Sequence, residues 1–351
     1  MNRSERRAAR KGRGGQVAEV LAAAIRSHQS GAALEAEHHY RGVLAMDPDH
    51  PAALHNLGIL AIQTGRNELA ADVIGRAIRL NRHNPDSHYN RAVALEALGR
   101  ADEAVAHYRE AVALRPDYAE GHLNLGNVLN QRGHADEALA SYRRALALRP
   151  ESAGAHYNIA NVLASRGELA EATTHYRKAV ALAPDFAEAR NNLANALKEG
   201  GLLDEAEAEY LRALALKPDY ADAHNNVGTL MAARGDLEAA AARYGRALQA
   251  RPDFADAHSN LGLALFSLGR REEAIGHVQK AILLRPDDLE ARLSLARQLY
   301  AVGDVAQAVG AATQALAVNP TADARELFAR YVGSLPDTAL AESHRDRISE
   351  A

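Results

Sequence analysis

Hydrophobic and polar positions recur along this chain at a fixed interval of 34 residues. When the opening stretch of each interval is wound as a helix at about 100° per residue, positions 4, 7, 8 and 11 gather on one side. They are mostly histidine, aliphatic or small residues, whereas positions 2, 6, 9 and 13 fall on the opposite side. This division predicts a helix that buries one side against its own repeat. An interval of this length is typical of a helix–turn–helix unit, so the pattern predicts an all-α solenoid.

Nine repeats fit the interval, starting at residues 17, 51, 85, 119, 153, 187, 221, 255 and 289, and the ninth ends near residue 322. A glycine stands at position 15 of every repeat. We expect it to end the first helix, because glycine enters the left-handed region without strain. A proline at position 32 of most repeats is expected to end the second helix, which it cannot continue.

Two further positions indicate how the helices pack. Alanine occupies position 20 in all nine repeats, and its small side chain predicts a close approach of the two helices. Tyrosine follows four residues later in six repeats, on the same face of the second helix. These tyrosines are Tyr40, Tyr108, Tyr142, Tyr176, Tyr210 and Tyr244.

A small residue at position 8, Ala at positions 20 and 27, Tyr at 24 and Pro at 32 together resemble the tetratricopeptide repeat (TPR) family over residues 17–322. The resemblance implies a right-handed superhelical solenoid of about nine helix–turn–helix units, whose first helices line a concave surface. The family's usual tryptophan at position 4 is replaced, mostly by histidine: His88, His122, His156, His224 and His258. We interpret these histidines as packing residues, because no Cys or carboxylate joins them at a metal-like spacing. No metal, cofactor or catalytic residue is predicted.

The two ends of the chain depart from the repeat. Residues 1–16 carry six basic side chains and are expected to be disordered, because they cannot bury enough apolar surface. A solubilising leader or an extension of the first helix is favoured over a nucleic-acid-binding arm, since no aromatic residue is interleaved for base stacking. Residues 323–351 are expected to form C-terminal capping helices, beginning with a tenth first helix at 322–332, or a connector into a further domain.

Composition limits the remaining classes of function. The chain has no cysteine, so disulfides are excluded and a reducing compartment is permitted. No apolar run approaches the roughly 18 residues that a membrane span needs, and we predict a cytoplasmic protein. The net charge is −4, with basic residues concentrated before residue 14, so the repeats are mildly acidic. No phosphate-binding loop, zinc-binding histidine pair or nucleophile–base set is recognisable, and the chain is predicted not to be an enzyme.

An asparagine recurs at position 6 of seven successive repeats, on the side of the first helix that faces away from its own core. Asparagine is unfavourable inside helices because its side chain competes with the backbone, so its recurrence indicates a use. We call this series the asparagine ladder: Asn56, Asn90, Asn124, Asn158, Asn192, Asn226 and Asn260. Asn127, Asn161 and Asn195 at position 9 add to it in the middle of the chain.

An amide both donates and accepts hydrogen bonds, as a peptide group does. The ladder is therefore predicted to bind an extended peptide segment of a partner protein in the concave groove. Two alternatives stay open: the amides bond to the neighbouring helix and rigidify the stack, or duplication of one repeat copied them without a function. Acidic residues at position 2 predict that the bound segment is basic or neutral: Asp86, Glu120, Glu188, Asp222, Asp256 and Glu290.

Near-identical 34-residue repeats with asparagine at position 6 are similar to the repeat region of O-linked N-acetylglucosamine transferases. That resemblance implies a ladder that holds the backbone of a protein substrate for a catalytic domain, yet no glycosyltransferase segment occurs in this sequence. The first hypothesis is a non-enzymatic adaptor. The second is the substrate-recruiting part of such a transferase, or of a methyltransferase or sulfotransferase, whose catalytic domain is absent from this chain. The third is a homo-oligomeric scaffold in which the tail of one chain fills the groove of another.

Overall fold

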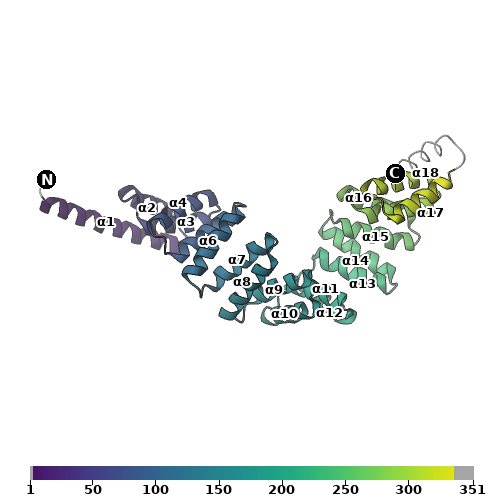
Figure 1. Cartoon of the computed structure of the whole chain (residues 1–351), viewed down its shortest axis with the longest axis horizontal. Coiled ribbons are helices and arrows are strands. Elements are labelled where there is room, and N and C mark those ends of the chain that lie inside the picture. The colour runs from purple at the N-terminus through teal and green to yellow at the C-terminus, as the bar shows by residue number, and fades with distance from the viewer. Residues whose placement is uncertain (1–2, 336–351) are drawn as a thin grey trace. The chain divides into compact units, whose positions relative to one another are not determined.

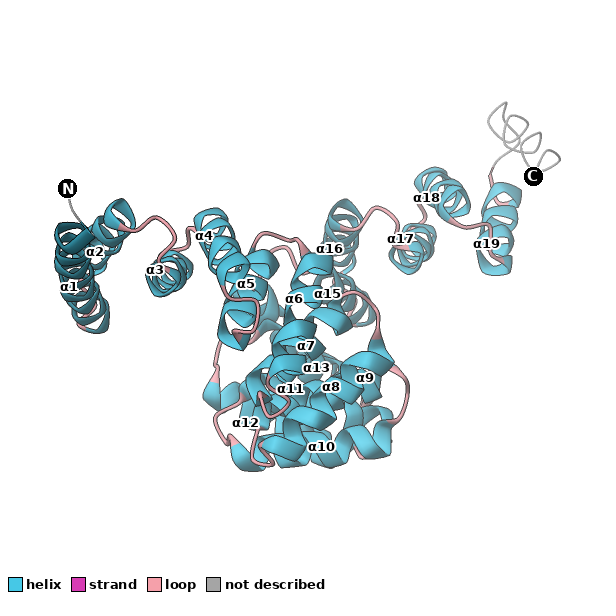
Figure 2. Cartoon of the chain, turned by 60° about the vertical axis from the view of Figure 1, so that its left-hand side comes forward, coloured by secondary structure: helices cyan, strands magenta, loops and turns pink. Residues whose placement is uncertain are grey.

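The computed structural model describes residues 3–335, and every regular element in that range is an α-helix (Figure 1). Nineteen helices follow one another through the described residues, joined by short turns and without a strand (Figure 2). The expected all-α repeat architecture is therefore confirmed. The chain forms two compact parts, Met1–Leu182 and Ala183–Ala351, which we call the N-terminal part and the C-terminal part.

Each repeat is a hairpin of two helices that pack against each other. The first helices are α1 (Arg3–Gln29), α3 (Pro51–Gln63), α5 (Pro85–Ala97), α7 (Ala119–Gln131), α9 (Ala153–Ser165), α11 (Ala187–Glu199), α13 (Ala221–Ala233), α15 (Ala255–Ser267) and α17 (Leu289–Ala301). The second helices are α2 (Ala33–Met46), α4 (Asn67–Leu80), α6 (Ala101–Leu114), α8 (Ala135–Leu148), α10 (Leu169–Leu182), α12 (Leu203–Leu216), α14 (Leu237–Ala250), α16 (Arg271–Leu284) and α18 (Val305–Val318). From α3 onward, every first helix starts at the first residue of its repeat, and every second helix starts at position 17.

From Arg3 onward, the N-terminal segment is helical, in line with the alternative of an extended first helix rather than with disorder. Helix α1 begins at Arg3 and runs without interruption into the first repeat. Its sequence is rich in arginine and alanine, which have high helix propensity. Extending a nucleated helix adds one hydrogen bond for each residue fixed, so propagation from the packed repeat needs no burial. Although α1 has 27 residues, no helix within residues 3–335 is both long and apolar enough to cross a membrane.

Glycine ends the first helix of every repeat. All nine glycines at position 15 have a positive φ, between 72° and 90°. In the fourth repeat, Gly133 has φ 81°, and the amide of His134 donates to the carbonyl oxygen of Leu129 at 2.9 Å. This hydrogen bond closes the end of α7 as a Schellman motif does. The chain can therefore reverse into α8 through a short turn.

The core of each repeat is a seam of small and aromatic side chains. The alanine at position 20 is fully buried, with 0% exposure, in all nine repeats. Four residues after Ala138, Tyr142 is 1% exposed, and its ring lies over Gly126 of α7. A Cβ atom on Gly126 would lie 2.5 Å from Cε1 of that ring. The missing side chain of Gly126 thus permits the close approach of the two helices in this repeat, and position 8 of the other repeats is Gly or Ala.

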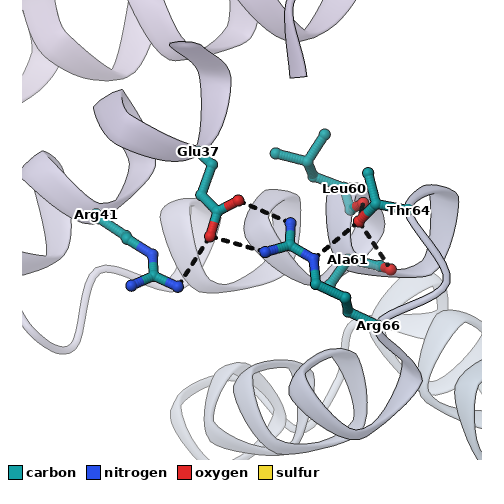
Figure 3. Close-up of polar contacts among 6 residues, drawn as sticks. All are labelled: Glu37, Arg41, Leu60, Ala61, Thr64 and Arg66. Atoms are coloured by element: carbon teal, nitrogen blue, oxygen red, sulfur yellow. Dashed lines mark hydrogen bonds and ion pairs between the residues drawn. The ribbon is translucent and has the colours of Figure 1, made fainter. Parts of the chain in front are cut away.

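Ion pairs on the surface link successive repeats. Figure 3 shows Glu37 of α2 between Arg41 of the same helix and Arg66, which precedes α4. The carboxylate oxygens of Glu37 lie 2.8 and 2.9 Å from two guanidinium nitrogens of Arg66, and Nε of Arg66 donates to Thr64 at 3.0 Å. The hydrogen bonds from Arg66 hold the pKa of Glu37 below its usual value. This contact fixes the turn of the second repeat against the first.

The last described helix, α19 (Ala322–Gly333), lies where a tenth first helix is expected. Phe328 stands at the position of the ladder asparagine and is 5% exposed, while Tyr331 and Val332 are each 2% exposed. These side chains join an apolar cluster with residues of α17 and α18, so α19 covers the apolar face of the ninth repeat. The remaining residues of the expected capping segment, 336–351, lie outside the described residues.

We predict opposite effects of alanine at Gly269 and Gly276, both of which have open space around the position of a Cβ atom. Gly269 has φ 81°, so alanine there should lower the free energy of unfolding by about 1 kcal/mol or more. Gly276 lies inside α16 and is exposed, so alanine should raise the free energy of unfolding by about 0.5–1 kcal/mol. Chemical denaturation of both variants checks this, and equal midpoints would contradict the assigned turn.

Candidate functional site

The first helices form a surface of their own within each part. In the N-terminal part α3 contacts α5 and α7 contacts α9, and in the C-terminal part α13 contacts α15 and α15 contacts α17. Among the described elements, second helices of neighbouring repeats do not approach each other to the same extent. Each part therefore has its first helices on the inner side of the stack. Position 6 of a repeat lies on this inner surface, opposite the core side of its own helix.

The ten asparagines of the predicted site all lie on first helices, and all are half-buried. A half-buried side chain can contact a bound segment as well as the protein. Six belong to the N-terminal part: Asn56, Asn90, Asn124, Asn127, Asn158 and Asn161. Four belong to the C-terminal part: Asn192, Asn195, Asn226 and Asn260. Peptide binding by these residues stays a prediction.

A hydrogen-bond motif of three residues joins neighbouring repeats. In the N-terminal part, Nδ2 of Asn158 donates to Oδ1 of Asn127 in the preceding repeat at 2.8 Å. The hydroxyl of Tyr142 donates to the same oxygen at 3.1 Å. Burial raises the pKa of Tyr142 to about 12, so the hydroxyl keeps its proton and remains a donor. The oxygen of Asn127 is thus occupied by two donors.

The same motif recurs in the C-terminal part. Nδ2 of Asn226 donates to Oδ1 of Asn195 at 3.0 Å, and the hydroxyl of Tyr210 donates to that oxygen at 2.5 Å. From the sequence, the tyrosines are predicted only to pack, and this hydrogen-bonding role is missed. A signal was present, because all three repeats with asparagine at position 9 also have tyrosine at position 24.

Other ladder residues bond to the preceding repeat in different ways. Nδ2 of Asn124 donates to the hydroxyl of Tyr89 at 2.9 Å, and Nδ2 of Asn260 donates to Oδ1 of Asn225 at 3.0 Å. Asn90 differs, because its side chain makes no hydrogen bond within residues 3–335. Position 9 of the repeat before it is Ile59, which offers no polar group. Many residues of the asparagine ladder thus join neighbouring repeats by hydrogen bonds, whereas Asn90 does not.

The acidic residues at position 2, from which a basic or neutral segment is expected, are mostly ion-paired within the chain. Five of them form ion pairs with a basic residue at position 31 of the same repeat, with N–O distances of 2.7–3.4 Å. Hydrogen bonds from Arg115, for example, hold the pKa of Asp86 below its usual value. The pairs are Asp86–Arg115, Glu120–Arg149, Glu188–Lys217, Asp222–Arg251 and Asp256–Arg285. Their charges are neutralised within the repeat.

The histidines at position 4 cap the turn that precedes their helix. Nε2 of each lies 2.9–3.3 Å from the carbonyl oxygen at position 32 of the preceding repeat, as for His224 and Pro218. Three of them also meet a second histidine, with Nδ1–Nδ1 distances of 2.9–3.0 Å: His88–His107, His156–His175 and His258–His277. In the described part of the chain, no group of three or more His, Cys, Asp or Glu side chains could hold a metal ion. Packing and capping account for these residues.

A groove of about 810 Å³ lies on the C-terminal part, over α13, α15 and α17. The ladder residues Asn226 and Asn260 line it, together with Ser294 at the ladder position of the ninth repeat. Leu263, which is 51% exposed, and Phe266 add an apolar patch. We call this hollow the C-terminal groove.

Fold and surface together define a helical-repeat protein of the solenoid class. A family model described as "TPR repeat" matches residues 126–165, 160–201, 194–233 and 228–269. Models described as "Tetratricopeptide repeat" match residues 29–85, 55–119, 255–288 and 289–314. The chain belongs to the tetratricopeptide repeat family.

Solved structures share this fold. A chain of the APC/C hetero-tetramer Cut9-Hcn1 is 18% identical and has a TM-score of 0.59, with 85% of this chain and 59% of that chain covered. PilF of Pseudomonas aeruginosa is 22% identical, with a TM-score of 0.55, over 60% of this chain and 97% of its own. YrrB, described as a TPR protein with an unusual peptide-binding site, is 27% identical over 54% of this chain and 97% of its own, but its TM-score of 0.47 supports no argument. The first two likenesses show the fold alone, and no curated protein matches the chain.

We predict that Asn158→Ala lowers stability relative to Asn90→Ala. Both changes replace asparagine in a helix by alanine and so gain the same propensity. Only Asn158→Ala removes a hydrogen bond to the preceding repeat, so its free energy of unfolding should be lower by about 0.5–1.5 kcal/mol. Chemical denaturation of the two variants measures the difference, and identical stabilities would show that the bond to Asn127 does not hold the stack.

Histidine burial makes the fold sensitive to acid. Burial, together with the nearby Arg91 and His88, lowers the pKa of His107 from 6.5 to about 4. Between these two pH values the unfolded chain binds a proton that the folded chain does not, so stability falls as the pH drops from 6.5. Burial lowers the pKa of other histidines in the same direction: His55, His122, His156, His175, His224 and His277.

We predict that His107→Asn weakens this pH dependence. Between pH 7 and pH 5, the variant should lose about 1 kcal/mol less stability than the wild type, after allowance for solvent screening. His134→Asn is the control, because that side chain is 55% exposed. Denaturation midpoints recorded across this pH range give the result. If the His107 variant and the control lose stability in parallel, burial of His107 is not a source of the acid sensitivity.

Proposed function

We propose that this chain is a non-catalytic scaffold that binds an extended peptide segment of a partner protein along its first helices. The tetratricopeptide fold is consistent with protein–protein interaction. The observation that carries the finer proposal is Asn90, a half-buried amide on the inner surface without a hydrogen bond in the described chain. An asparagine that joins no neighbouring repeat brings only its unfavourable helix propensity to folding. A peptide group would supply it with both a donor and an acceptor.

The hydrogen bonds within the protein leave side-chain donors and acceptors available for such a peptide segment. Oδ1 of Asn127 already accepts two hydrogen bonds, so its Nδ2 is left to donate. Nδ2 of Asn158 uses a hydrogen within the protein, so its Oδ1 is left to accept. Neighbouring donors and acceptors suit the N–H and C=O groups of an extended backbone. The same residues can therefore hold the stack and present the binding surface.

The strength of each contact indicates that several repeats act together. A single amide contact contributes about 0.5–1.5 kcal/mol, whereas association costs at least several kcal/mol in lost freedom. Contact with a single ladder asparagine is therefore insufficient for stable binding, and the bound segment must span several repeats. Because the position-2 acids in five repeats are ion-paired, we propose a neutral segment rather than a basic one.

A second candidate is a substrate-recruiting role for a modifying enzyme. The resemblance of the asparagine ladder to that of O-linked N-acetylglucosamine transferases supports it. In this case the bound segment would be a substrate passed to a catalytic domain, supplied by another chain or by a longer gene product. Recovery of a glycosyltransferase, methyltransferase or sulfotransferase with the chain after cross-linking in cells would favour this role over the adaptor. A cytoplasmic location is part of both proposals, and a chain without cysteine is compatible with a reducing compartment.

Ladder variants test the proposal directly. Short linear peptides of random sequence, displayed on phage, are selected on the purified full chain, and the affinity of the enriched peptides is then measured. Asn90→Ala should leave the melting temperature unchanged or slightly higher and weaken peptides bound along the N-terminal part by about two- to tenfold. The combined replacement of Asn124, Asn158, Asn192 and Asn226 by Ala should weaken binding further.

The control is Asn130→Ala, which replaces an exposed asparagine of α7 outside the ladder. It should leave affinity unchanged. If no displayed peptide binds the wild type, or if every ladder variant binds as well as the Asn130 control, the chain does not use its ladder to hold peptides.

A further inference from the structure

The bonding pattern of the ladder stops at its C-terminal end. Asn260 of α15 still bonds to Asn225 of the preceding repeat. In the ninth repeat the ladder position is Ser294, whose shorter side chain does not continue the pattern. Ser259, at position 5 of α15, has a buried hydroxyl oxygen without a hydrogen-bond partner. Both serines line the C-terminal groove.

A buried amide in the same groove also lacks a partner. Gln298 of α17 is 2% exposed and lines the C-terminal groove. Its Nε2 donates to Oγ of Ser294 at 3.2 Å, but its Oε1 accepts no hydrogen bond. Gln298 occupies position 10, which is apolar and buried in seven other repeats: Leu60, Ala94, Val128, Val162, Ala196, Leu230 and Ala264.

A polar side chain at this apolar position destabilises the free protein. A buried acceptor without a donor loses its hydrogen bonds to water and forms none in the protein to replace them. The terminal torsion of glutamine is broad in energy, so a small rotation turns the amide towards the groove that its side chain lines. A ligand with an N–H donor would then satisfy Oε1 of Gln298. A neighbouring C=O could accept from the hydroxyl of Ser259.

The charges in the groove largely cancel. Asp256 and Asp288 lie 2.9 and 3.5 Å from Arg285, and Arg297 lies 3.3 Å from Asp323. Lys198 and Glu290 also line the groove, and they carry opposite charges without an ion pair in the described chain. A strongly charged ligand would therefore gain little net attraction. The exposed side chain of Leu263 instead offers apolar area to a ligand.

We propose that the C-terminal groove is the primary docking site of the chain, and that it takes a neutral, extended polypeptide segment with an aliphatic or aromatic side chain. The backbone N–H of the segment bonds to Oε1 of Gln298, a backbone C=O accepts from Ser259, and the apolar side chain packs on Leu263 and Phe266. This site rests on the proposed function, because it is the place along the repeats where a bound peptide would supply partners to buried oxygens that have none. Elsewhere many ladder amides already make one hydrogen bond to a neighbouring repeat, and only their other end is left for a peptide.

Gln298→Leu separates binding from folding. Leucine restores the apolar side chain that Leu60 and Leu230 have at this position, so the variant should melt at a higher temperature than the wild type. Peptides selected from the displayed random library on the wild-type full chain should bind it about three- to tenfold more weakly. Ser259→Ala should weaken them in the same direction. Gln279→Leu, the same exchange on the exposed face of α16, should leave their affinity unchanged.

Three outcomes would overturn the proposal. Unchanged affinity of Gln298→Leu, with weakened ladder variants of the N-terminal part, would exclude this groove and leave the proposed function intact. Enriched peptides that are strongly charged or without an apolar residue would exclude the stated partner. If no displayed peptide binds the wild type, the proposed function fails and this site fails with it. Raised stability with lowered affinity in Gln298→Leu is the result that supports the site.

Discussion

Close contact between the two helices of each repeat is the constraint on which the structure depends. The alanine at position 20 is fully buried in all nine repeats, and Tyr142 lies against Gly126 where a Cβ atom would clash with its ring. A hairpin packed in this way still leaves apolar area on both sides. Neighbouring repeats must cover it, and α19 covers the last one. Stability therefore accumulates from repeat to repeat, as expected for a solenoid.

The inner surface combines two roles in the same side chains. Hydrogen bonds from Asn158 and Tyr142 to Asn127 join neighbouring repeats and at the same time fix which end of each amide remains available. Ion pairs between positions 2 and 31 neutralise the charge along this surface in five repeats. A surface built in this way favours ligands that offer hydrogen bonds over ligands that offer charge. The C-terminal groove departs from it, because Gln298 and Ser259 keep unpaired oxygens there.

Most of the fold is predictable from the sequence because its determinants are local and copied nine times. The turn requires a residue with a positive φ at position 15, and all nine glycines there have one. The start residues of α3 to α17 likewise coincide with the predicted repeats. For the N-terminal segment the burial criterion predicts disorder, but α1 extends back to Arg3 by helix propagation, as the alternative of an extended first helix predicts. The side of the first helix on which the ladder lies also follows from helix periodicity.

The sequence alone thus determined the repeat, its turns and the side of the helix on which the asparagines lie, because each depends on residues a few positions apart. Only the tertiary structure decided what those asparagines touch. Their partners lie 31 or 35 residues away, as for Asn158 with Asn127 and Asn260 with Asn225, and helix periodicity within one repeat does not specify such contacts. The tertiary structure also decided that Gln298, one of many polar residues in the sequence, lies buried with an unpaired oxygen. The burial of a side chain and its hydrogen-bond partners depend on how successive repeats pack, because each repeat contacts the side chains of the next.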